Sequence, residues 1–400
     1  MRKINLIGAL LVAASLSAPH GPAGHAGAAD EDDRAVVRGN SAFAFDLYSE
    51  LKGTDGNLFF SPFSVSAALA MTYGGARTRT EEQMAHVLHF DLPQDRLHRA
   101  FPALGDPSPR DGAYQLMVAN ALWGQEGYGF LDEFLALANE HYDAGFREVD
   151  FQGATERARR KINAWVADRT EGIIEELLHP GDLDPAVALV LTNAIYFKGN
   201  WVGRFDREYT QDGRFRIDRE NEVTVPMMHR TGRFVYAEED DLSVLELPYE
   251  GDRLAMVVLL PKAVDGLAEL ESSLNKENLD RWLARSTEQP VRVSLPRFAI
   301  ENRFDLAETL RGMGMTDAFS GRADFSGMTG RRDLFISMVV HQAKLEVNEE
   351  GTEAAAGSAV VLKRGAPPAS FVAVHPFVFL IRDRRTGSIL FIGRMVNPQA

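Results

Sequence analysis

Several features are missing from this sequence, and each absence excludes a class of protein. Its 400 residues contain no cysteine, which excludes disulfide scaffolds, cysteine-ligated zinc, iron–sulfur clusters and thiol catalysis. Acidic residues outnumber basic ones and give a formal charge of −14, which argues against binding to nucleic acid or an anionic membrane. No internal repeat and no Gly/Ser-rich or Pro-rich linker divides the chain. The remaining composition, 45% hydrophobic and 25% charged, is that of a globular protein with one large or two smaller domains.

The N-terminus is typical of a secretory signal. Two cations are followed by the apolar segment 4–18 and then by the small residues Ala26-Gly27-Ala28. A membrane anchor is the alternative, but the apolar segment is short and continues into His, Pro and Gly. We therefore expect residues 1–28 to be a signal peptide and residues 29–400 to be the mature, secreted protein, either extracellular or periplasmic.

The hydrophobic pattern changes from helical spacing in the first half to strand-like runs in the second. Segment 186–197 is a β-rich apolar run too continuous for a one-sided strand, so we expect it to be buried on both faces. The order of elements predicts an α+β fold with more than one sheet. The expected helices are 36–51, 63–73, 80–88, 154–178 (interrupted near Gly172), 267–284 and 305–313, and the other expected strands are 223–228, 233–237, 242–248, 254–260, 291–298, 339–347, 371–381 and 388–396.

No motif in the sequence points to catalysis. HExxH, GxSxG and Walker A patterns are absent, and Gly312-Met313-Gly314 lacks the third glycine of a dinucleotide-binding turn. His86 and His89 lie one turn apart, but two imidazoles without a third ligand are more often ordinary helix surface than a metal site. We expect no catalytic residue, no metal and no cofactor.

Residues 348–370 do not fit the pattern of a compact domain. They join two strand-like segments over more than twenty residues, which is long for such a connection. A flexible linker is the simple interpretation, yet the stretch is rich in alanine and turns apolar at Val360-Val361-Leu362. Every second residue from Thr352 to Leu362 is small or apolar, and none of them is charged. Since alternate residues of a strand share one face, this pattern is typical of a strand that enters a sheet. The segment is therefore a loop that could become a strand, and Pro367-Pro368 would end its pairing.

Six separated segments resemble the serpin family. They are Asn57 to Ser64 (NLFFSPFS), Thr192 to Trp201 (TNAIYFKGNW), Val291 to Phe298 (VRVSLPRF), Gly351 to Ala355 (GTEAA), His375 to Phe379 (HPFVF) and Phe391 to Pro398 (FIGRMVNP). The resemblance covers nearly all of residues 35–398. It implies a single α+β domain of about nine helices and three β-sheets, with an exposed reactive-centre loop at about 349–371.

The resemblance also implies a function. An inhibitory serpin traps a serine protease: the protease cleaves the loop and forms an acyl-enzyme, and the hinge then inserts as a new central strand of the main sheet. Such a protein is an inhibitor and not an enzyme, and we expect a monomer whose partner is a serine protease. The alternative is a non-inhibitory serpin acting as a carrier, storage or chaperone-like binding protein. An unrelated secreted hydrolase would need a catalytic constellation that the sequence does not display.

Residue roles follow from the same resemblance. The hinge matches Glu349, Glu350, Gly351 and Thr352, and its small-residue continuation matches Glu353, Ala354, Ala355, Ala356 and Gly357. A charge or a proline at Thr352, Ala354 or Ala356 would indicate a non-inhibitory member, and the sequence has neither. The shutter and breach, where the sheet opens, match Ser61, Ser64, Asn193, His341, Lys198 and Trp201.

Two positions remain open for the cleaved bond. Counting from Gly351 at the family's usual loop length gives Gly365–Ala366, which suits an elastase-like enzyme. One residue earlier, Arg364–Gly365 suits a trypsin-like protease, with Lys363 as a further basic option, and we favour Arg364. Residues 78–90 match the helix that binds glycosaminoglycans in some serpins, but they carry only one Arg and two His, so we do not expect activation by heparin.

Overall fold

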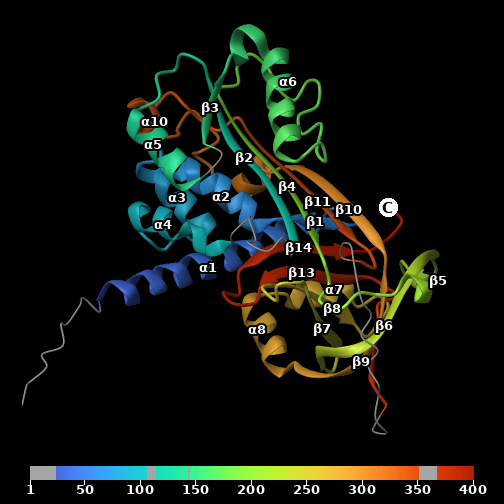
Figure 1. The fold of residues 1–400 in the computed structure, drawn as a ribbon. Helices are drawn as coiled ribbons and strands as arrows, with labels where there is room; N and C mark the ends of the chain where they lie inside the picture. Colours follow the sequence, from blue (N-terminus) through green and yellow to red (C-terminus); the bar gives the residue numbers. More distant parts are fainter. Residues whose placement is uncertain (1–23, 106–113, 143–144, 351–366) are drawn as a thin grey trace, which may run out of the picture.

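The computed structural model describes residues 24–105, 114–142, 145–350 and 367–400. These residues form ten α-helices and two β-sheets, so the predicted α+β class is confirmed (Figure 1). The first five helices and α10 gather on one side, and α6 lies at the end of the molecule away from the larger sheet (Figure 1). The helices are α1 (Gly24–Leu51), α2 (Pro62–Tyr73), α3 (Thr78–Leu88), α4 (Gln94–Ala100), α5 (Asp132–His141), α6 (Phe151–Arg169), α7 (Leu267–Ser273), α8 (Lys276–Arg285), α9 (Ala307–Gly312) and α10 (Ser326–Thr329).

The smaller sheet has five strands in the order β10-β11-β4-β2-β3. Its central strand β4 has only one residue that is not fully buried, which confirms the prediction of a strand covered on both faces. The neighbours β4 and β11 run parallel, whereas β4 pairs with β2 and β11 pairs with β10 in the antiparallel sense. The strands are β2 (Tyr114–Gln125), β3 (Phe146–Val149), β4 (Leu189–Gly199), β10 (Phe298–Asp305) and β11 (Met338–Val347).

The larger sheet has nine strands in the order β1-β14-β13-β8-β7-β6-β9-β12, with β5 beside β6. Strand β6 is 17 residues long and pairs with β5 near its start, with β9 along its middle and with β7 at its end. Because β6 joins both halves, the described strands form two continuous sheets rather than three separate ones. The strands are β1 (Leu58–Phe60), β5 (Gln211–Arg216), β6 (Glu222–Glu238), β7 (Leu242–Pro248), β8 (Leu254–Pro261), β9 (Thr287–Pro296), β12 (Ala369–Val372), β13 (Phe377–Asp383) and β14 (Ile389–Met395).

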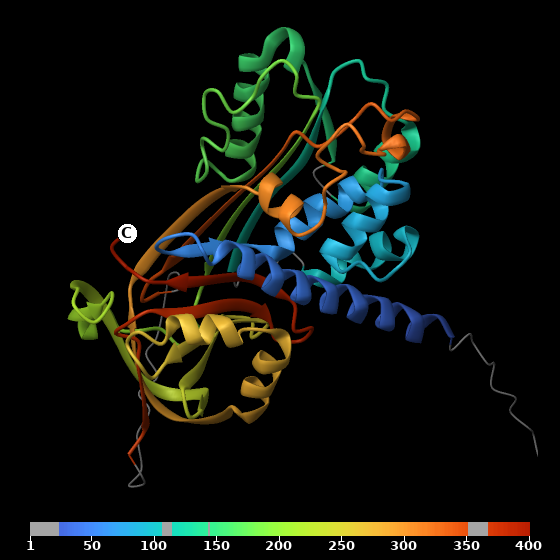
Figure 2. The same ribbon diagram turned by 180° about the vertical axis from the view of Figure 1, so that it is seen from behind.

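Helix α2 shows how local sequence sets an element at the centre of the fold. Ser61 caps its N-terminus by accepting a hydrogen bond from the backbone N–H of Ser64, and Pro62 occupies the first turn. Apart from the half-buried Ala67, every residue of the helix is buried. Figure 2 shows α1 running along the same side of the molecule and ending beside β14.

Several predicted boundaries were wrong, for local reasons. The helix expected over 154–178 ends at Arg169, because Glu171 and Gly172 both have positive φ. The helix expected over 267–284 is two helices, separated where Asn275 caps α8. The strand expected over 291–298 is split between β9 and β10, and the one over 371–381 between β12 and β13.

The strands expected over 223–228 and 233–237 form one strand, β6, and the remaining corrections concern the first half of the chain. Helix α1 begins at Gly24, twelve residues before the expected start. Strand β2 was missed. Among the described residues, no helix is long and apolar enough to cross a membrane.

Candidate functional site

The central feature of the five-stranded sheet is its parallel pair, β4 and β11. Eight residue pairs join them, from Met338 opposite Val190 to Leu345 opposite Phe197. Strand β11 ends at Val347 and leads within three residues to Gly351, where the undescribed segment 351–366 begins. A segment that turned back after β11 would run antiparallel to both strands of the pair. If the pair separated, that segment could therefore hydrogen-bond to both neighbours at once.

A row of polar residues crosses the sheet at this pair. Asn120 on β2 lies opposite Asn193 on β4, and Asn193 lies opposite His341 on β11. Serines 61 and 64, at the start of α2, meet this row from one face. We call these five residues the polar cluster. Four of them, Ser61, Ser64, Asn193 and His341, are completely inaccessible to solvent in an otherwise apolar core.

Hydrogen bonds link the members of the polar cluster in one direction. The backbone N–H of Ser61 donates to Nε2 of His341 at 3.1 Å, and the His341 ring bonds through Nδ1 to Oδ1 of Asn193. The Asn193 amide donates to Oγ of Ser64 at 2.7 Å and to Oδ1 of Asn120 at 2.6 Å. Oγ of Ser64 also donates to Oδ1 of Asn120 at 3.0 Å. Because each group depends on the next, the loss of one member leaves buried polar atoms unsatisfied.

The cluster fixes the protonation state of His341. The Ser61 N–H can only donate, so Nε2 of His341 must be an acceptor and Nδ1 carries the ring proton. Burial lowers the pKa of His341 to about 3, because the charged imidazolium would have to be desolvated. The imidazole is therefore neutral at physiological pH and joins α2 to the sheet by hydrogen bonds alone.

Ser61 connects the polar cluster to the larger sheet. Its Oγ accepts from the backbone N–H of Ser64 at 3.1 Å, as a helix N-cap does, and donates to the carbonyl oxygen of Leu390 on β14 at 2.7 Å. The same side chain thus caps α2 and contacts a strand of the other sheet. A movement of β4 against β11 would disturb contacts in both sheets.

At the end of β11, the start of the predicted hinge contacts side chains from the β4–β5 connection and from Arg297, which lies between β9 and β10. Nε1 of Trp201 donates to the carbonyl oxygen of Asn348 at 2.9 Å, and the indole stacks on Tyr249 with centroids 4.5 Å apart. Glu349 is buried, and its Oε1 accepts from Oγ1 of Thr210 at 2.8 Å. Its other oxygen lies 3.6 Å from Nη1 of Arg297.

The rest of the hinge root is more exposed. Glu350 forms an ion pair with Arg207, whose side chain is 70% exposed. The backbone N–H of Phe205 donates to the carbonyl oxygen of Glu349 at 3.0 Å. The chain is therefore anchored at Asn348 and Glu349 through buried groups, and the anchoring weakens at Glu350.

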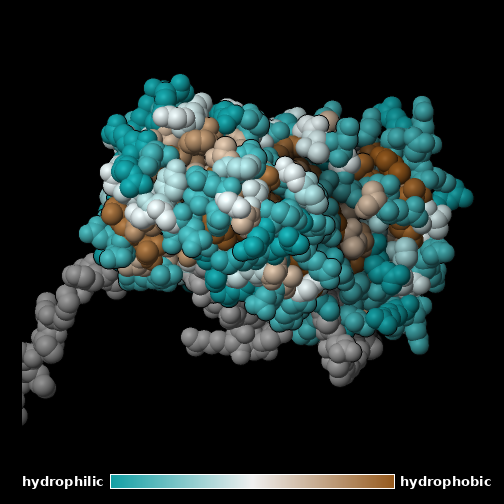
Figure 3. All heavy atoms as spheres, turned by 90° about the horizontal axis from the view of Figure 1, so that it is seen from above, coloured by the Kyte–Doolittle hydropathy of each residue, from teal (hydrophilic) through white to brown (hydrophobic). Residues whose placement is uncertain are grey.

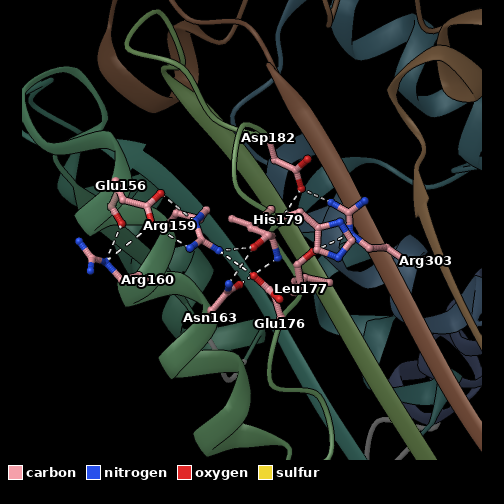
Figure 4. A network of polar contacts seen from close by, with 10 residues as sticks. Glu156, Arg159, Arg160, Asn163, Glu176, Leu177, His179, Asp182 and Arg303 are labelled. Atoms are coloured by element: carbon pink, nitrogen blue, oxygen red, sulfur yellow. Dashed lines mark hydrogen bonds and ion pairs between the residues drawn. The ribbon is translucent and has the colours of Figure 1, made fainter.

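Helix α6 and the chain that follows it lie across the sheet above the parallel pair (Figure 4). Arg159 and Asn163 on α6 donate to the carbonyl oxygen of Leu178, each at 2.8 Å. Farther along, Nε of Arg303 on β10 donates to the carbonyl oxygen of Leu177, and its guanidinium forms an ion pair with Asp182. The segment after α6 thus bridges from α6 to β10, and a separation of β4 from β11 would strain these contacts.

The structure brings together some of the residues singled out from the sequence and separates others. Ser61, Ser64, Asn193 and His341 are in direct contact, and Trp201 lies at the hinge root. Lys198 is half-buried on β4 opposite Gln115 and contacts neither group by a hydrogen bond or ion pair among the described residues. The predicted hinge residues Gly351 to Gly357 and the reactive-site residues Lys363, Arg364, Gly365 and Ala366 lie outside the described residues.

Sequence reasoning missed three residues of the site. Asn120 is one, although an amide within the apolar run VANALW was a detectable signal of a buried polar contact. Thr210 and Arg297, which contact Glu349, are the others: Arg297 lies in the segment Val291 to Phe298 that resembles the serpin family, but only the fold shows that both residues reach Glu349. Among the described residues no group of three or more His, Asp or Glu could hold a metal ion.

Comparison with known proteins agrees with this geometry. The family model described as "Serpin (serine protease inhibitor)" matches residues 38–398. A leukocyte elastase inhibitor of Sus scrofa is 46% identical over 372 residues, covering 90% of this chain and 98% of that protein. An uncharacterized serpin-like protein of Thermococcus kodakarensis is 45% identical over 377 residues, covering 92% of this chain and 87% of that protein.

Solved structures give the same result for the fold. Uncleaved ovalbumin is similar with a TM-score of 0.83 and 34% identity, covering 91% of this chain and 100% of that one. The insect serpin Serpin48 of Tenebrio molitor is similar with a TM-score of 0.82 and 32% identity, covering 91% and 98% of the two chains. These similarities confirm the fold that the sequence resemblance implied.

Proposed function

Because the chain belongs to the serpin family of serine protease inhibitors, we propose that it is a secreted suicide inhibitor of a trypsin-like or elastase-like protease. The protease would cleave the loop between Glu350 and Pro367 and form an acyl-enzyme on its own serine. The freed hinge would then insert between β4 and β11 and carry the protease away before hydrolysis. The protein would act as an inhibitor and not as an enzyme.

The parallel pair of β4 and β11 carries this proposal. An inserted strand that follows β11 is antiparallel to both neighbours, so it replaces one parallel ladder by two antiparallel ladders. The existing ladder joins eight residue pairs, and β4 and β11 are 11 and 10 residues long. Insertion would therefore add roughly ten backbone hydrogen bonds, worth on the order of 10 kcal/mol at about 1 kcal/mol each. That gain is comparable with the total stability of an ordinary domain.

The sequence of the hinge suits insertion. The alternate residues Thr352, Ala354 and Ala356 are small and uncharged, so one face of the new strand can be buried without an unpaired charge. Fourteen residues at roughly 3.3 Å each would span about 46 Å, the length of a long sheet. Anchoring at Asn348 and Glu349 leaves the chain beyond Glu350 to move once the loop is cut.

The bond we propose for cleavage is Arg364–Gly365, with Gly365–Ala366 as the alternative. Arg364 suits the acidic pocket of a trypsin-like enzyme, and the neighbouring Lys363 adds a second basic residue. The similarity to a leukocyte elastase inhibitor supports an elastase-like target, which the small residue Gly365 would suit.

Incubation with trypsin and with elastase tests the proposal. An inhibitor forms a complex that survives denaturing gel electrophoresis, and the mass of the released C-terminal peptide identifies the cleaved bond. The Thr352→Arg variant is the matched control, because it places a charge on the face that must be buried, and it should be cleaved without forming the complex. Cleavage of the wild-type protein without a complex would support the non-inhibitory alternative.

Secretion is a separate part of the proposal. Cleavage after Ala28 would fall within α1, but Asp30 and Asp32, which pair with Arg34 and Arg96, lie beyond the cut. The remaining helix would keep these contacts. Mass analysis of the protein exported from its own cells should give a chain that begins at Ala29, and an intact Met1 on the exported protein would contradict the prediction.

A further inference from the structure

One side of α6 carries positive charge that the inhibitory mechanism does not use. Helical spacing places Arg157, Lys161 and Trp165 on the side of α6 opposite the contacts drawn in Figure 4. The edge strand β3 adds Arg147 beneath them, and Arg169 ends the helix. We call these five residues the α6–β3 flank.

Arg147 is the centre of the α6–β3 flank. Its guanidinium carbon lies 5.0 Å from the centroid of the Trp165 ring and 5.9 Å from that of Trp123. The two indoles are themselves edge to face, 5.5 Å apart, so the guanidinium rests against a rigid aromatic corner. Nε of Arg147 is buried without a hydrogen-bond partner, and among the described residues the side chain makes no ion pair.

A second cation, Arg169, lies close to Arg147. The guanidinium of Arg169 lies 5.8 Å from the centroid of the same Trp165 ring. Burial and the charge of Arg169 both lower the pKa of Arg147, and no carboxylate acts in the opposite direction. A partly desolvated cation without a counter-charge is costly, and such sites are normally paired.

Lys161 and Arg157 extend the charge along the helix. Nζ of Lys161 donates to the carbonyl oxygen of Glu148, the residue after Arg147 on β3, at 3.2 Å, which leaves two of its donors available. Arg157 is exposed and makes no hydrogen bond or ion pair with the described residues. Among the described residues, the acidic residue on this side of α6 is Asp168, whereas the side chain of Glu148 alternates to the other face of β3.

We propose that the α6–β3 flank binds a tetrahedral oxyanion, the sulfate or phosphate group of a small charged ligand, with Arg147 as the principal contact. A guanidinium donates in a planar fork that matches two oxygens of such a group, and Lys161 contributes a point charge beside it. The ligand would supply the counter-charge that Arg147 lacks. Figure 3, which looks down on this end of the molecule, shows a mostly hydrophilic surface with separated apolar areas, as a charged ligand requires.

The proposed site is distinct from the helix considered for heparin. That helix, α3, carries Arg77 and Arg79 near its start, where Arg79 lies 3.4 Å from the buried carboxylate of Asp317. Its positive charge is therefore already neutralised in part. The charged residues of α6 lie outside the six segments that resemble the serpin family. The expectation that heparin does not activate the protein through α3 therefore does not apply to them.

Thermal unfolding of the full chain tests the site without using inhibition. Sodium sulfate or sodium phosphate is added at constant ionic strength, with sodium chloride as the balance. A ligand that binds only the folded protein raises the melting temperature in a saturable way. We expect such a rise for the wild-type protein, and we expect Arg147→Gln to weaken the binding about tenfold, the loss of one charge-assisted contact.

Two further variants make the result specific. Lys161→Ala removes an exposed side chain and should weaken binding by a few fold with little effect on folding. Arg214→Gln removes the same charge from an exposed residue of β5 and should bind like the wild type. The proposal would be overturned if sulfate and phosphate raised the melting temperature no more than chloride does. It would also be overturned if the rise were equal in the wild type and in Arg147→Gln.

Two compounds show whether the bound oxyanion belongs to a sulfated glycan or to a phosphorylated ligand. A sulfated oligosaccharide that binds more tightly than inorganic sulfate, and that depends on Arg147 and Lys161, would indicate a sulfated glycan. Pyrophosphate that binds more tightly than inorganic phosphate with the same dependence would indicate a phosphorylated ligand. Failure of either test leaves the proposed protease inhibition unaffected, because the reactive loop takes no part in it.

Discussion

The neutral state of His341 predicts that acid weakens the polar cluster. The pKa of His341 in the folded protein is about 3, compared with 6.5 for the ordinary side chain. Between these values the unfolded chain binds a proton that the folded chain does not. The contribution of His341 to stability is therefore complete above pH 6.5 and is lost progressively as the pH falls toward 3.

The size of the effect follows from the two pKa values. At pH 5 the unfolded imidazole is almost fully protonated and the folded one is almost fully neutral, so the loss from this residue is about 2 kcal/mol. The surrounding groups, Ser61, Asn193 and Asn120, do not titrate in this range. His341→Gln offers hydrogen-bonding groups of similar reach without a titrating proton, which makes it the matched variant.

Melting temperatures of the two proteins at pH 7.5 and pH 5 measure the effect. The wild type should lose a few degrees more than His341→Gln over this interval. His98, whose pKa burial lowers to about 4, and His375, whose pKa burial also lowers, are present in both proteins, so their contributions cancel. An equal loss of stability in the two proteins would refute the assignment of a neutral, buried imidazole.

Three further substitutions have expected outcomes. Asn193→Ala leaves buried donors and acceptors unpaired and should lower the unfolding free energy by about 3 kcal/mol, measured by chemical denaturation. Arg394→Ala removes the partner of a buried carboxylate and should cost about 3–5 kcal/mol in the same assay, whereas Arg214→Ala, in an exposed pair, should cost less than about 1 kcal/mol. Arg297→Ala removes the charge that faces buried Glu349, so the chain at Asn348 and Glu349 should be held less firmly. Heating should then give more oligomers of this variant than of the wild type on a native gel. An unchanged oligomer fraction would contradict a role of Arg297 in holding Glu349.

The sequence predicted those elements whose structure depends on residues that are close to one another along the chain. The helix over 63–73, which is α2, and the continuous apolar run of β4 were both predicted. At the turn that joins β13 to β14, Gly387 has a φ of 79° and its N–H donates to the carbonyl oxygen of Asp383. In each case the residue type itself favours the conformation found.

Strand β2 shows where local signals fail. Its sequence, YQLMVANALWGQ, contains Leu, Met, Ala and Gln, which favour helices, and its burial does not alternate regularly. Pairing with β4 over eleven positions makes it a strand. The preference of isolated residues was overridden by partners about seventy-five residues away in the chain.

From the sequence came the alternate uncharged residues Thr352, Ala354 and Ala356 and the basic pair Lys363-Arg364, and the resemblance to the serpin family pointed to the polar residues of the site. The folded chain makes β4 and β11 parallel neighbours, although His341 and Asn193 are 148 residues apart. The tertiary structure also decided that His341 is neutral and that Thr210 and Arg297 hold Glu349. The physical reason is that strand pairing and desolvation depend on residues brought together by the whole fold, which no local segment of the sequence encodes.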